Sequence, residues 1–215
     1  TGRTLTFNGN ANTITAPVGT RTFTTTVGFS GNFDFIWCLR GTDNVIINNF
    51  RFLDSTTNTT AATQMEAAIA MFNLNASGTF DGCQGIRITN NTFVLATLNG
   101  ASAAIQATPF IRFNTSTLTW AVDDDRHRDI TVTGNTLLEG YSFLAFRSAT
   151  NNFKTRRYQI SNNTLYNVGG NTTAFPNQAN GIWGQQTDSI ICTNNLILSD
   201  SSHASGTWFG ISLSP

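Results

Sequence analysis

The sequence feature that most constrains the fold is a nine-residue pattern that occurs five times. In each copy, apolar residues occupy positions 2, 4 and 9, and Asn or Gly occupies position 6. The copies are Asn44–Phe52, Gly85–Phe93, Asp129–Leu137, Arg157–Leu165 and Ser189–Ile197. Self-similar segments of this kind are typical of stacked repeats, in which each unit buries its apolar face against its neighbours.

The spacing within each copy predicts a strand, a bend and a second short strand. Apolar residues two positions apart point to the same side of a strand. Asn and Gly at position 6 favour a bend, because both tolerate left-handed backbone. One such unit cannot close a core alone, so the pattern predicts a stack of units. We expect the side chains of the Asn column to form a hydrogen-bonded ladder between units. That column is Asn49, Asn90, Gly134, Asn162 and Asn194, and the ladder is expected over it and its Asn neighbours, Asn48, Asn91, Asn135, Asn163 and Asn195.

A further strand is expected before each copy. The clearest examples contain Ile-Trp followed by Thr-Asp, and weaker ones are apolar runs. These strands are Phe35–Val45, Ala67–Phe72, Phe110–Phe113, Ser142–Phe146 and Gly181–Ile190, with Gly210–Leu213 as the last. Counted by the first apolar column, the copies lie 41, 44, 28 and 32 residues apart. Constant strands at unequal spacing indicate that the variation in length lies in loops.

Composition supports an all-β domain and excludes several classes. Asn and Thr make up 60 of the 215 residues, only 11% of residues are charged, and the formal net charge is zero. Thr favours strands and Asn favours turns, whereas neither favours helix interiors. A balanced charge without a basic run argues against a nucleic-acid partner, and no apolar run is long enough for membrane insertion. Three cysteines match no metal or redox spacing, and we interpret Cys192 as a buried, inert thiol.

The charge cluster Asp123–Asp129 holds four of the ten aspartates. We predict that it lies on a loop beside a groove, with Asp123, Asp124, Asp125 and Arg126 as catalytic residues and His127 as a binding residue. Two carboxylates in one site can act as acid and base in glycoside hydrolysis. The alternative is a solvated turn with internal ion pairs.

Basic residues are concentrated at Arg147, Lys154, Arg156 and Arg157. In a stack, these residues are expected beside Asp129 and the aspartates of the preceding unit. We interpret Arg147 as catalytic, and Arg156 and Arg157 as substrate-binding groups for an acidic sugar. The alternative is a salt-bridged surface, where an exposed pair contributes ~0–1 kcal/mol.

Trp37 and Trp183 form the second candidate binding surface. Each follows an Ile and precedes a Thr-Asp pair, so the two Ile-Trp dipeptides are expected at equivalent positions. Because neighbours in a strand face opposite sides, buried Ile residues would place both Trp side chains outside on one face. An exposed aromatic pair is typical of a binding surface. The alternative is that loops such as 166–180 cover it.

With its Gly-Ile and Val-x-Ile-x-Asn-Asn-x-Phe patterns, the chain resembles the right-handed parallel β-helices of the pectate-lyase-like superfamily over residues 34–215. Thr4–Ile14 resembles an early coil or cap of that fold, so residues 1–33 are expected to form an N-terminal coil or cap. The resemblance implies about six coils with variable loops in a single domain. That superfamily includes polysaccharide lyases, polygalacturonases, phage tailspikes and non-enzymatic surface proteins.

The resemblance also implies a second role for Asp123–Asp125, which is to hold Ca²⁺ while Arg126 or Arg128 abstracts a proton beside a uronate. No other cofactor is expected. The catalytic series of the polygalacturonases does not occur in the sequence, and the calcium-binding set of the pectate lyases has no clear match.

Two functions are consistent with the sequence. The first is an extracellular module, on a cell surface or a virion, that binds an extended polysaccharide or surface glycan. If the module is an enzyme, it is expected to be a polysaccharide lyase or a glycoside hydrolase. The second is a non-enzymatic structural or adhesive β-helix, part of a fibre, spike or cell-surface protein. The open final strand at Gly210–Leu213 needs a partner, so a homo-oligomer or a longer parent chain is expected.

Overall fold

The computed structural model describes twelve segments of the chain, and all statements about structure concern these. They are residues 3–15, 35–54, 67–72, 74–76, 79–94, 103–107, 126–139, 142–147, 155–166, 179–185, 187–198 and 208–214. These segments contain twenty strands and no helix, so the described part of the chain is all-β. Within these segments, no helix is long and apolar enough to cross a membrane.

Eighteen strands form three parallel sheets of six strands each. Sheet A contains β1 (Leu5–Asn8), β4 (Val45–Asn48), β9 (Arg87–Thr89), β12 (Arg128–Thr133), β15 (Thr155–Ser161) and β18 (Thr187–Thr193). Sheet B contains β2 (Thr13–Thr15), β5 (Arg51–Leu53), β10 (Thr92–Val94), β13 (Thr136–Glu139), β16 (Thr164–Leu165) and β19 (Leu196–Ile197). Sheet C contains β3 (Phe35–Arg40), β6 (Ala67–Phe72), β11 (Ala103–Ala107), β14 (Ser142–Arg147), β17 (Ala179–Gln185) and β20 (Trp208–Ser214).

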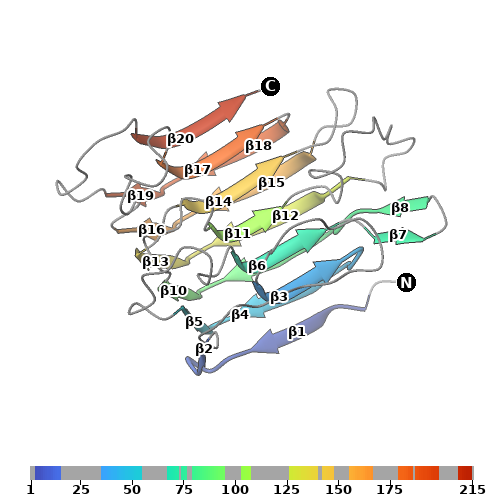
Figure 1. Ribbon diagram of the computed structural model, residues 1–215, viewed down its shortest axis with the longest axis horizontal. Helices are drawn as coiled ribbons and strands as arrows, with labels where there is room; N and C mark the ends of the chain where they lie inside the picture. The colour runs from blue at the N-terminus through green and yellow to red at the C-terminus, as the bar shows by residue number, and fades with distance from the viewer. Residues whose placement is uncertain are drawn as a thin grey trace.

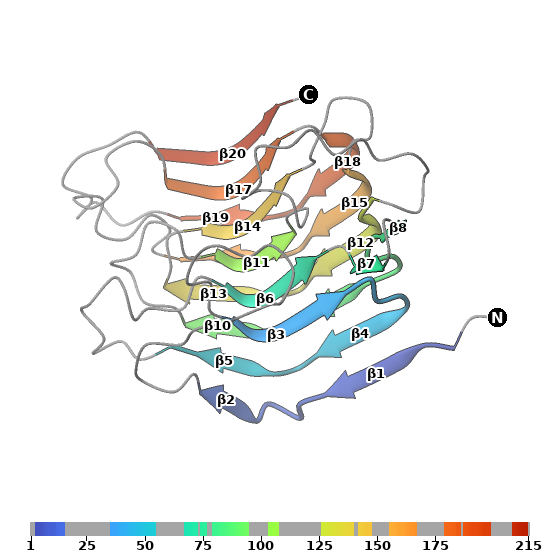
Figure 2. The same cartoon turned by 45° about the vertical axis from the view of Figure 1, so that its right-hand side comes forward.

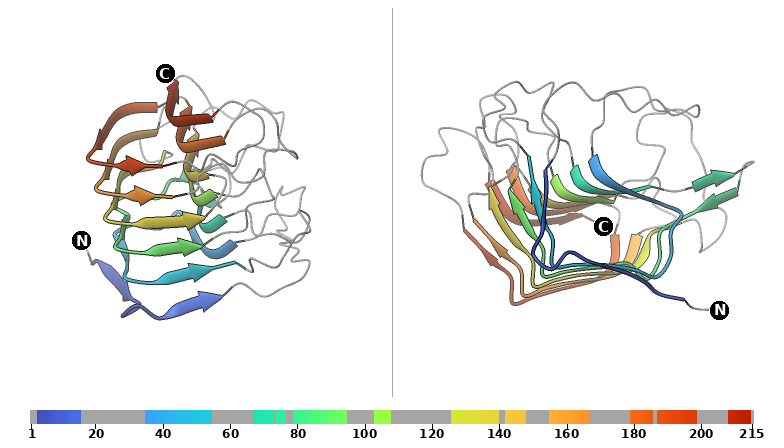
Figure 3. Two further views of the ribbon diagram at one scale, coloured as in Figure 1. Left: turned by 90° about the vertical axis from the view of Figure 1, so that its left-hand side faces the viewer. Right: turned by 90° about the horizontal axis from the view of Figure 1, so that it is seen from below.

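The chain visits the three sheets in a fixed order. It passes through A, B and C once, then moves one strand along each sheet and repeats the circuit, so that three strands make one unit and six units follow one another (Figure 1). Figure 2 shows the units as successive layers from β1 to β20. Seen along the stack, the three sheets surround a common interior (Figure 3). This arrangement is compatible with a solenoid. The remaining strands, β7 (Leu74–Ala76) and β8 (Thr79–Asp81), form an antiparallel hairpin.

Strand register confirms the repeat alignment. The first apolar column continues through sheet A, and a residue of the first unit, Leu5, joins it. The second column does the same with Phe7, and the third runs through sheet B from Ile14. From Ile47 to Ile160 the second column is fully buried. The columns therefore form the core between the sheets, as the alternation of apolar and polar residues requires.

The bends between sheets A and B use the predicted Asn column. Its five residues all have positive φ, between 54° and 67°. A second column with positive φ, not foreseen from the sequence, precedes sheet A and consists of Asn44, Gly85, Asp129, Arg157 and Ser189. Asn and Gly adopt this backbone at little cost, whereas it is strained for Arg157. The corners are therefore fixed by backbone conformation.

The predicted ladder is present, and it uses one Asn of each pair. The first Asn of each pair makes the left-handed bend, whereas the second, buried Asn carries the ladder. Asn91, Asn135 and Asn163 each donate from the backbone N–H and from Nδ2 to the Oδ1 of the Asn in the next unit, at 2.8–3.1 Å. The accepting residues are Asn135, Asn163 and Asn195, respectively. Nδ2 also donates to a backbone carbonyl of the preceding unit.

Sheet C differs from the sequence prediction in its third strand. The third place in sheet C, which the sequence assigned to Phe110–Phe113, is occupied by Ala103–Ala107, which pairs with β6 and β14. Residues 110–113 lie outside the described residues. The strand Ala103–Ala107 contains one large apolar residue, Ile105. The aromatic segment Phe110–Phe113 shows a clearer apolar pattern, so the sequence prediction placed the strand there.

Neighbouring Asn residues provide a direct test of the ladder. We expect Asn163→Ala to lower the free energy of unfolding by about 3 kcal/mol, because it leaves buried groups such as the Val132 carbonyl without partners. We expect Asn162→Gly to change it by less than about 0.5 kcal/mol, because Gly accepts the same left-handed backbone. Urea unfolding of both variants measures this difference, and equal losses would contradict the assignment of the two roles.

Candidate functional site: a groove on the outer face of sheet A

The candidate site lies on the outer face of sheet A, where side chains of consecutive units form rows across the strands. The residues between the two buried columns point outward. One outward row is Thr6, Ile46, Arg87, Thr131, Gln159 and Ile191, which register places side by side. Beside it lies the left-handed corner column. Since neighbouring strands are about 4.8 Å apart, each unit contributes one member to each row at that interval.

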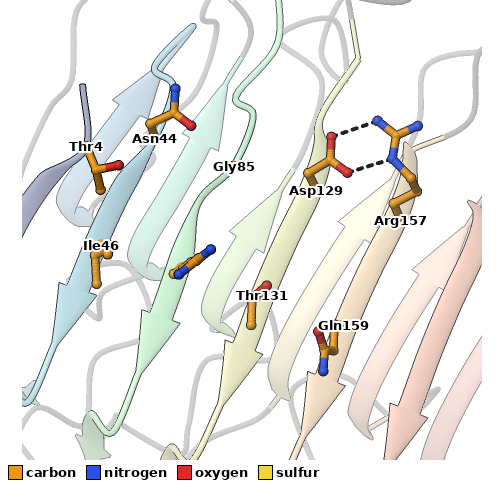
Figure 4. A pocket seen from close by; sticks show the side chains of 9 residues that line it. Thr4, Asn44, Ile46, Gly85, Asp129, Thr131, Arg157 and Gln159 are labelled. Carbon is orange, nitrogen blue, oxygen red and sulfur yellow. Dashed lines mark hydrogen bonds and ion pairs between the residues drawn. The ribbon is translucent and has the colours of Figure 1, made fainter. Parts of the chain in front are cut away.

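These two rows enclose a shallow groove of about 330 Å³. It is lined by Thr4, Asn44, Ile46, Gly85, Arg87, Asp129, Thr131, Arg157 and Gln159. Figure 4 shows the labelled members in two lines that cross the strands. A second hollow of about 370 Å³ shares Arg157 and Gln159 and extends the groove to Ile191. The groove therefore runs along the stack and draws on all six units.

Gly85 makes the hollow in the middle of the groove. Its φ is +62°, and a Cβ atom at this position would lie 2.7 Å from Oδ1 of Asn44. The lack of a side chain leaves space between Asn44 and Asp129, which occupy the same column on either side (Figure 4). This gap lies between Asn44 on one side and the ion pair of Asp129 and Arg157 on the other.

Asp129 and Arg157 form a bidentate ion pair in adjacent units. Nε of Arg157 donates to Oδ1 of Asp129 at 2.6 Å, and Nη2 donates to Oδ2 at 2.7 Å. The hydrogen bond from Arg157 is the main cause that lowers the pKa of the Asp129 carboxyl below its ordinary value of 3.8. The side chains remain 46% and 42% exposed. The sequence prediction that opposite charges lie side by side in this region is confirmed for this pair.

Arg87 is the second cation of the groove. Its side chain is exposed, and it makes no ion pair with any described residue, unlike Arg157. One negative and two positive side chains leave the described groove with a positive balance. The remaining polar lining consists of amides and hydroxyls. Such a surface can hold hydroxyl-rich and negatively charged groups, because amides and hydroxyls both donate and accept, and the guanidinium forms charge-assisted hydrogen bonds.

The described groove contains one carboxylate, Asp129, which Arg157 keeps ionised. Acid–base cleavage of a glycosidic bond needs two carboxyl groups, one of them protonated. Asp129 alone does not meet this requirement. The predicted catalytic residues Asp123, Asp124 and Asp125 lie outside the described residues, and their roles stay predictions. A Ca²⁺ site at these aspartates also stays a prediction. Among the described residues, no three His, Cys, Asp or Glu side chains form a group that could hold a metal ion.

The other predicted site residues are spread over several places. Arg126 is partly buried and does not line the groove. Arg147 stands at the end of β14, opposite Gln185, on a different sheet. Arg156 precedes Arg157 and lies between Arg128 and Asp188 in register. Of the predicted basic residues that the structure describes, Arg157 lines the groove, whereas Lys154 lies outside the described residues.

The expected equivalence of Trp37 and Trp183 is wrong. Trp37 pairs with Ile69, in the column that continues to Ile182, whereas Trp183 pairs with Ala145 in the neighbouring column. Trp37 therefore points inward, where its ring lies 5.1 Å from the rings of Phe7 and Phe50. Trp183 is half-buried. A shift of one residue in a strand moves a side chain to the opposite face, so the two Trp residues do not form one surface.

His127 is also directed away from the groove. It is fully buried, and its Nδ1 accepts a hydrogen bond of 2.9 Å from the backbone N–H of Cys83. Burial raises the pKa of the Cys83 thiol to about 12 and raises the pKa of Tyr158 above its ordinary range. These residues belong to the interior, so His127 does not contact a ligand bound on the outer face.

The three cysteines are free thiols, and Cys192 is half-buried instead of buried as predicted.

Sequence reasoning did not select Asn44, Gly85, Arg87 or Gln159. The signal that identifies them was present in the repeat alignment, because each occupies an outward position or a corner position between apolar columns. The sequence analysis selected rare or clustered charged residues as the site instead. In a stacked fold, the useful criterion is the column of a residue and not its local neighbourhood in the sequence.

Comparison with known proteins does not extend these observations: no family model, no curated protein and no solved structure matches the chain.

The ion pair predicts a small, pH-dependent coupling. In a double-mutant cycle with Asp129→Asn and Arg157→Gln, we expect a coupling energy below about 1 kcal/mol, because both side chains are exposed to solvent. Since folding lowers the carboxyl pKa, this stabilisation is complete above pH 3.8 and is lost as the pH falls through the lower folded-state value. Urea unfolding across this range measures it, and a coupling that grows on acidification would contradict the assigned pair.

Burial predicts that Cys83 is unreactive in the folded protein. At pH 8 a thiol with a pKa of about 12 is ionised in about one molecule in ten thousand, and only the thiolate reacts. We therefore expect Cys83→Ala to leave the fast phase of thiol labelling unchanged and to remove one thiol from the count in urea. Labelling with a chromogenic disulfide follows both quantities. Loss of the fast phase in this variant would show that Cys83 is accessible.

Proposed function

We propose that the chain is a right-handed parallel β-helix of the pectate-lyase-like type that binds an extended polysaccharide along the outer face of sheet A. Three parallel sheets visited in a fixed order support the β-helix. Parallel strands of one sheet joined by a crossover are almost always connected in the right-handed sense, which supports the handedness. The fold by itself does not determine the activity, so the functional proposal rests on the groove.

The observation that carries the proposal is the direction and chemistry of the groove. It crosses the strands of sheet A, and its lining repeats at the strand spacing of about 4.8 Å. A polymer of pyranose rings in an extended conformation can therefore present successive rings to successive units. Asn44, Thr131 and Gln159 offer amide and hydroxyl groups to sugar hydroxyls. The shallow, open shape suits a long ligand that is held at many points.

The charges of the groove favour a ligand with acidic groups. Arg87 supplies a guanidinium that no described residue neutralises, whereas Asp129 neutralises much of Arg157. A carboxylate or sulfate on the sugar would replace the solvent around Arg87 and gain a charge-assisted hydrogen bond. We place this module outside the cell, on a cell surface or a virion, where extended polysaccharides are encountered.

Binding without cleavage is the activity that the described residues support. The single carboxylate of the described groove, Asp129, is ionised, holds Arg157 and has no second carboxyl group beside it in the groove lining. The module is then adhesive. It combines the polysaccharide binding of the first function considered from the sequence with the non-enzymatic role of the second. Cleavage would need groups from outside the described residues, of which Asp123–Asp125 are the candidates.

The binding prediction compares two exposed arginines on different sheets. In affinity electrophoresis through gels that contain neutral or acidic polysaccharides, we expect the chain to be retarded by an acidic one. We expect Arg87→Ala to weaken this binding by a factor of about 10 or more, which is the loss of one charge-assisted hydrogen bond. The matched control Arg51→Ala changes an exposed arginine of sheet B and should leave binding unchanged.

The same samples are assayed for cleavage through reducing ends and the ultraviolet absorbance of unsaturated products. Retardation without products supports an adhesive module. Products that disappear in Asp124→Ala would instead assign cleavage to the aspartate loop. Equal retardation of the Arg87→Ala and Arg51→Ala variants, or no retardation by any polysaccharide of the panel, would overturn the groove as the binding site.

A further inference from the structure

The outer face of sheet A carries two outward rows that differ in their hydrogen bonding. The row next to the bend is connected across units, since Oγ1 of Thr89 donates to Oδ1 of Asn48 at 2.9 Å and the hydroxyls of Thr133 and Ser161 lie 3.1 Å apart. The side chains of the row in the groove make no hydrogen bond with any described residue. In the second to fifth units these are Ile46, Arg87, Thr131 and Gln159. The groove row is therefore the one whose polar groups are available to a ligand.

The charge of the groove lining changes from one unit to the next. The third unit contributes the exposed guanidinium of Arg87, and the fourth contributes the carboxylate of Asp129, which is ionised and 46% exposed. The second unit adds no charge to the lining, because its members are the amide of Asn44 and the apolar side chain of Ile46. Neighbouring strands lie about 4.8 Å apart. The cation therefore has a neutral neighbour on one side and a negative neighbour on the other.

This order of charges distinguishes between acidic polymers. If successive rings lie over successive units and every ring is acidic, one acidic group lies beside Arg87 and the next lies beside Asp129. The first contact is attractive and the second is repulsive. An acidic group on every second ring avoids the repulsion, because the ring over the fourth unit then offers O–H or N–H groups that the Asp129 carboxylate accepts. The groove therefore favours a polymer in which acidic and neutral rings alternate.

The second unit indicates which group the neutral ring carries. The amide of Asn44 is exposed and makes no side-chain hydrogen bond with any described residue, and Ile46 in the same strand is half-buried. Figure 4 shows the Asn44 amide turned toward Gly85, where a Cβ atom would lie 2.7 Å from Oδ1 of Asn44. An acetamido group matches this place, because its amide can exchange hydrogen bonds with Asn44 while its methyl group covers Ile46.

We propose that the ligand of the groove is a linear acidic polysaccharide in which uronic acid rings alternate with rings of an N-acetylated amino sugar. This inference rests on the proposed function, and it adds which acidic polymer is selected and which residues select it. Arg87 holds the carboxylate of one ring, and Asn44 and Ile46 hold the acetamido group of the neighbouring ring. Asp129 disfavours a polymer that is acidic on every ring.

Two polymers separate this selectivity from a general attraction to polyanions. Hyaluronan carries a carboxylate on every second ring and an acetamido group on the others, whereas polygalacturonate carries a carboxylate on every ring. Affinity electrophoresis compares them at equal carboxylate concentration and physiological ionic strength, where long-range charge effects are screened. We expect the chain to bind hyaluronan about tenfold more tightly than polygalacturonate.

Asp129→Asn tests the origin of the selectivity. The variant keeps a hydrogen-bond acceptor and removes the charge, so the preference for hyaluronan over polygalacturonate should fall about tenfold. Asp188→Asn is the matched control, because Asp188 is an exposed aspartate of sheet A that lines neither hollow. It should leave the preference unchanged. A preference that stays the same in Asp129→Asn, or falls equally in both variants, would overturn the role of Asp129.

The acetamido contact is tested by changing one methyl group of the polymer. De-N-acetylated hyaluronan is re-acylated with either acetyl or formyl groups, which both restore the amide and differ in the methyl group. We expect the acetyl form to bind about threefold more tightly, the effect of one buried methyl group. Ile46→Thr should abolish this difference, whereas Leu138→Thr, at an exposed position of sheet B, should keep it. Equal binding of the two forms by the wild-type chain would overturn the acetamido assignment.

The outcomes distinguish this inference from the function on which it rests. Equal binding of hyaluronan and polygalacturonate that is lost in Arg87→Ala would keep the groove as the binding site and overturn the alternation. Tighter binding of polygalacturonate would overturn the alternation as well. Binding of neither polymer would overturn the inference, and the absence of binding to any acidic polysaccharide would overturn the proposed function with it.

Discussion

The hydrogen bonding from one unit to the next is the constraint on which this structure depends. Each ladder Asn uses its backbone N–H, its Nδ2 and its Oδ1 to connect three units, and it does so inside the core. An unpaired amide at such a site would cost more than the bond contributes. The ladder therefore permits one register, and that register places every apolar column inward. Sheet pairing alone would allow one strand to shift along its neighbour, because parallel strands offer equivalent backbone hydrogen bonds after each such shift.

The same constraint explains the composition of the chain. Left-handed corners require Asn or Gly in one column, and the ladder requires Asn in the next. Outward strand positions then take Thr, Ser, Gln or Asn, since these side chains pair across units, as Thr133 and Ser161 do at 3.1 Å. Little of the surface needs charged side chains. The left-handed column before sheet A departs from Asn at Gly85, Asp129, Arg157 and Ser189. Gly85 provides the hollow there, and Asp129 with Arg157 provides the ion pair, and these two features define the groove.

Much of the fold could be predicted because the repeat carries it. The apolar columns, the bend and the all-β class follow from alternation and from the residue at position 6. The position of the ladder could not be derived, because two adjacent Asn residues satisfy the bend in either order and burial decides between them. Trp37 was misplaced because matching dipeptides suggested equivalence, whereas register separates Trp37 and Trp183 by one residue. The groove depends on which side chains the stack brings together from units 28 to 44 residues apart.

The groove draws on consecutive units, so a polymer that lies along it meets one member of each outward row at every strand of sheet A. In the proposed function, a weak contact per sugar ring acts several times along one polymer, and the effective concentration of each further contact rises. The regular strand spacing that the ladder fixes is therefore also the property that suits the outer face to an extended ligand.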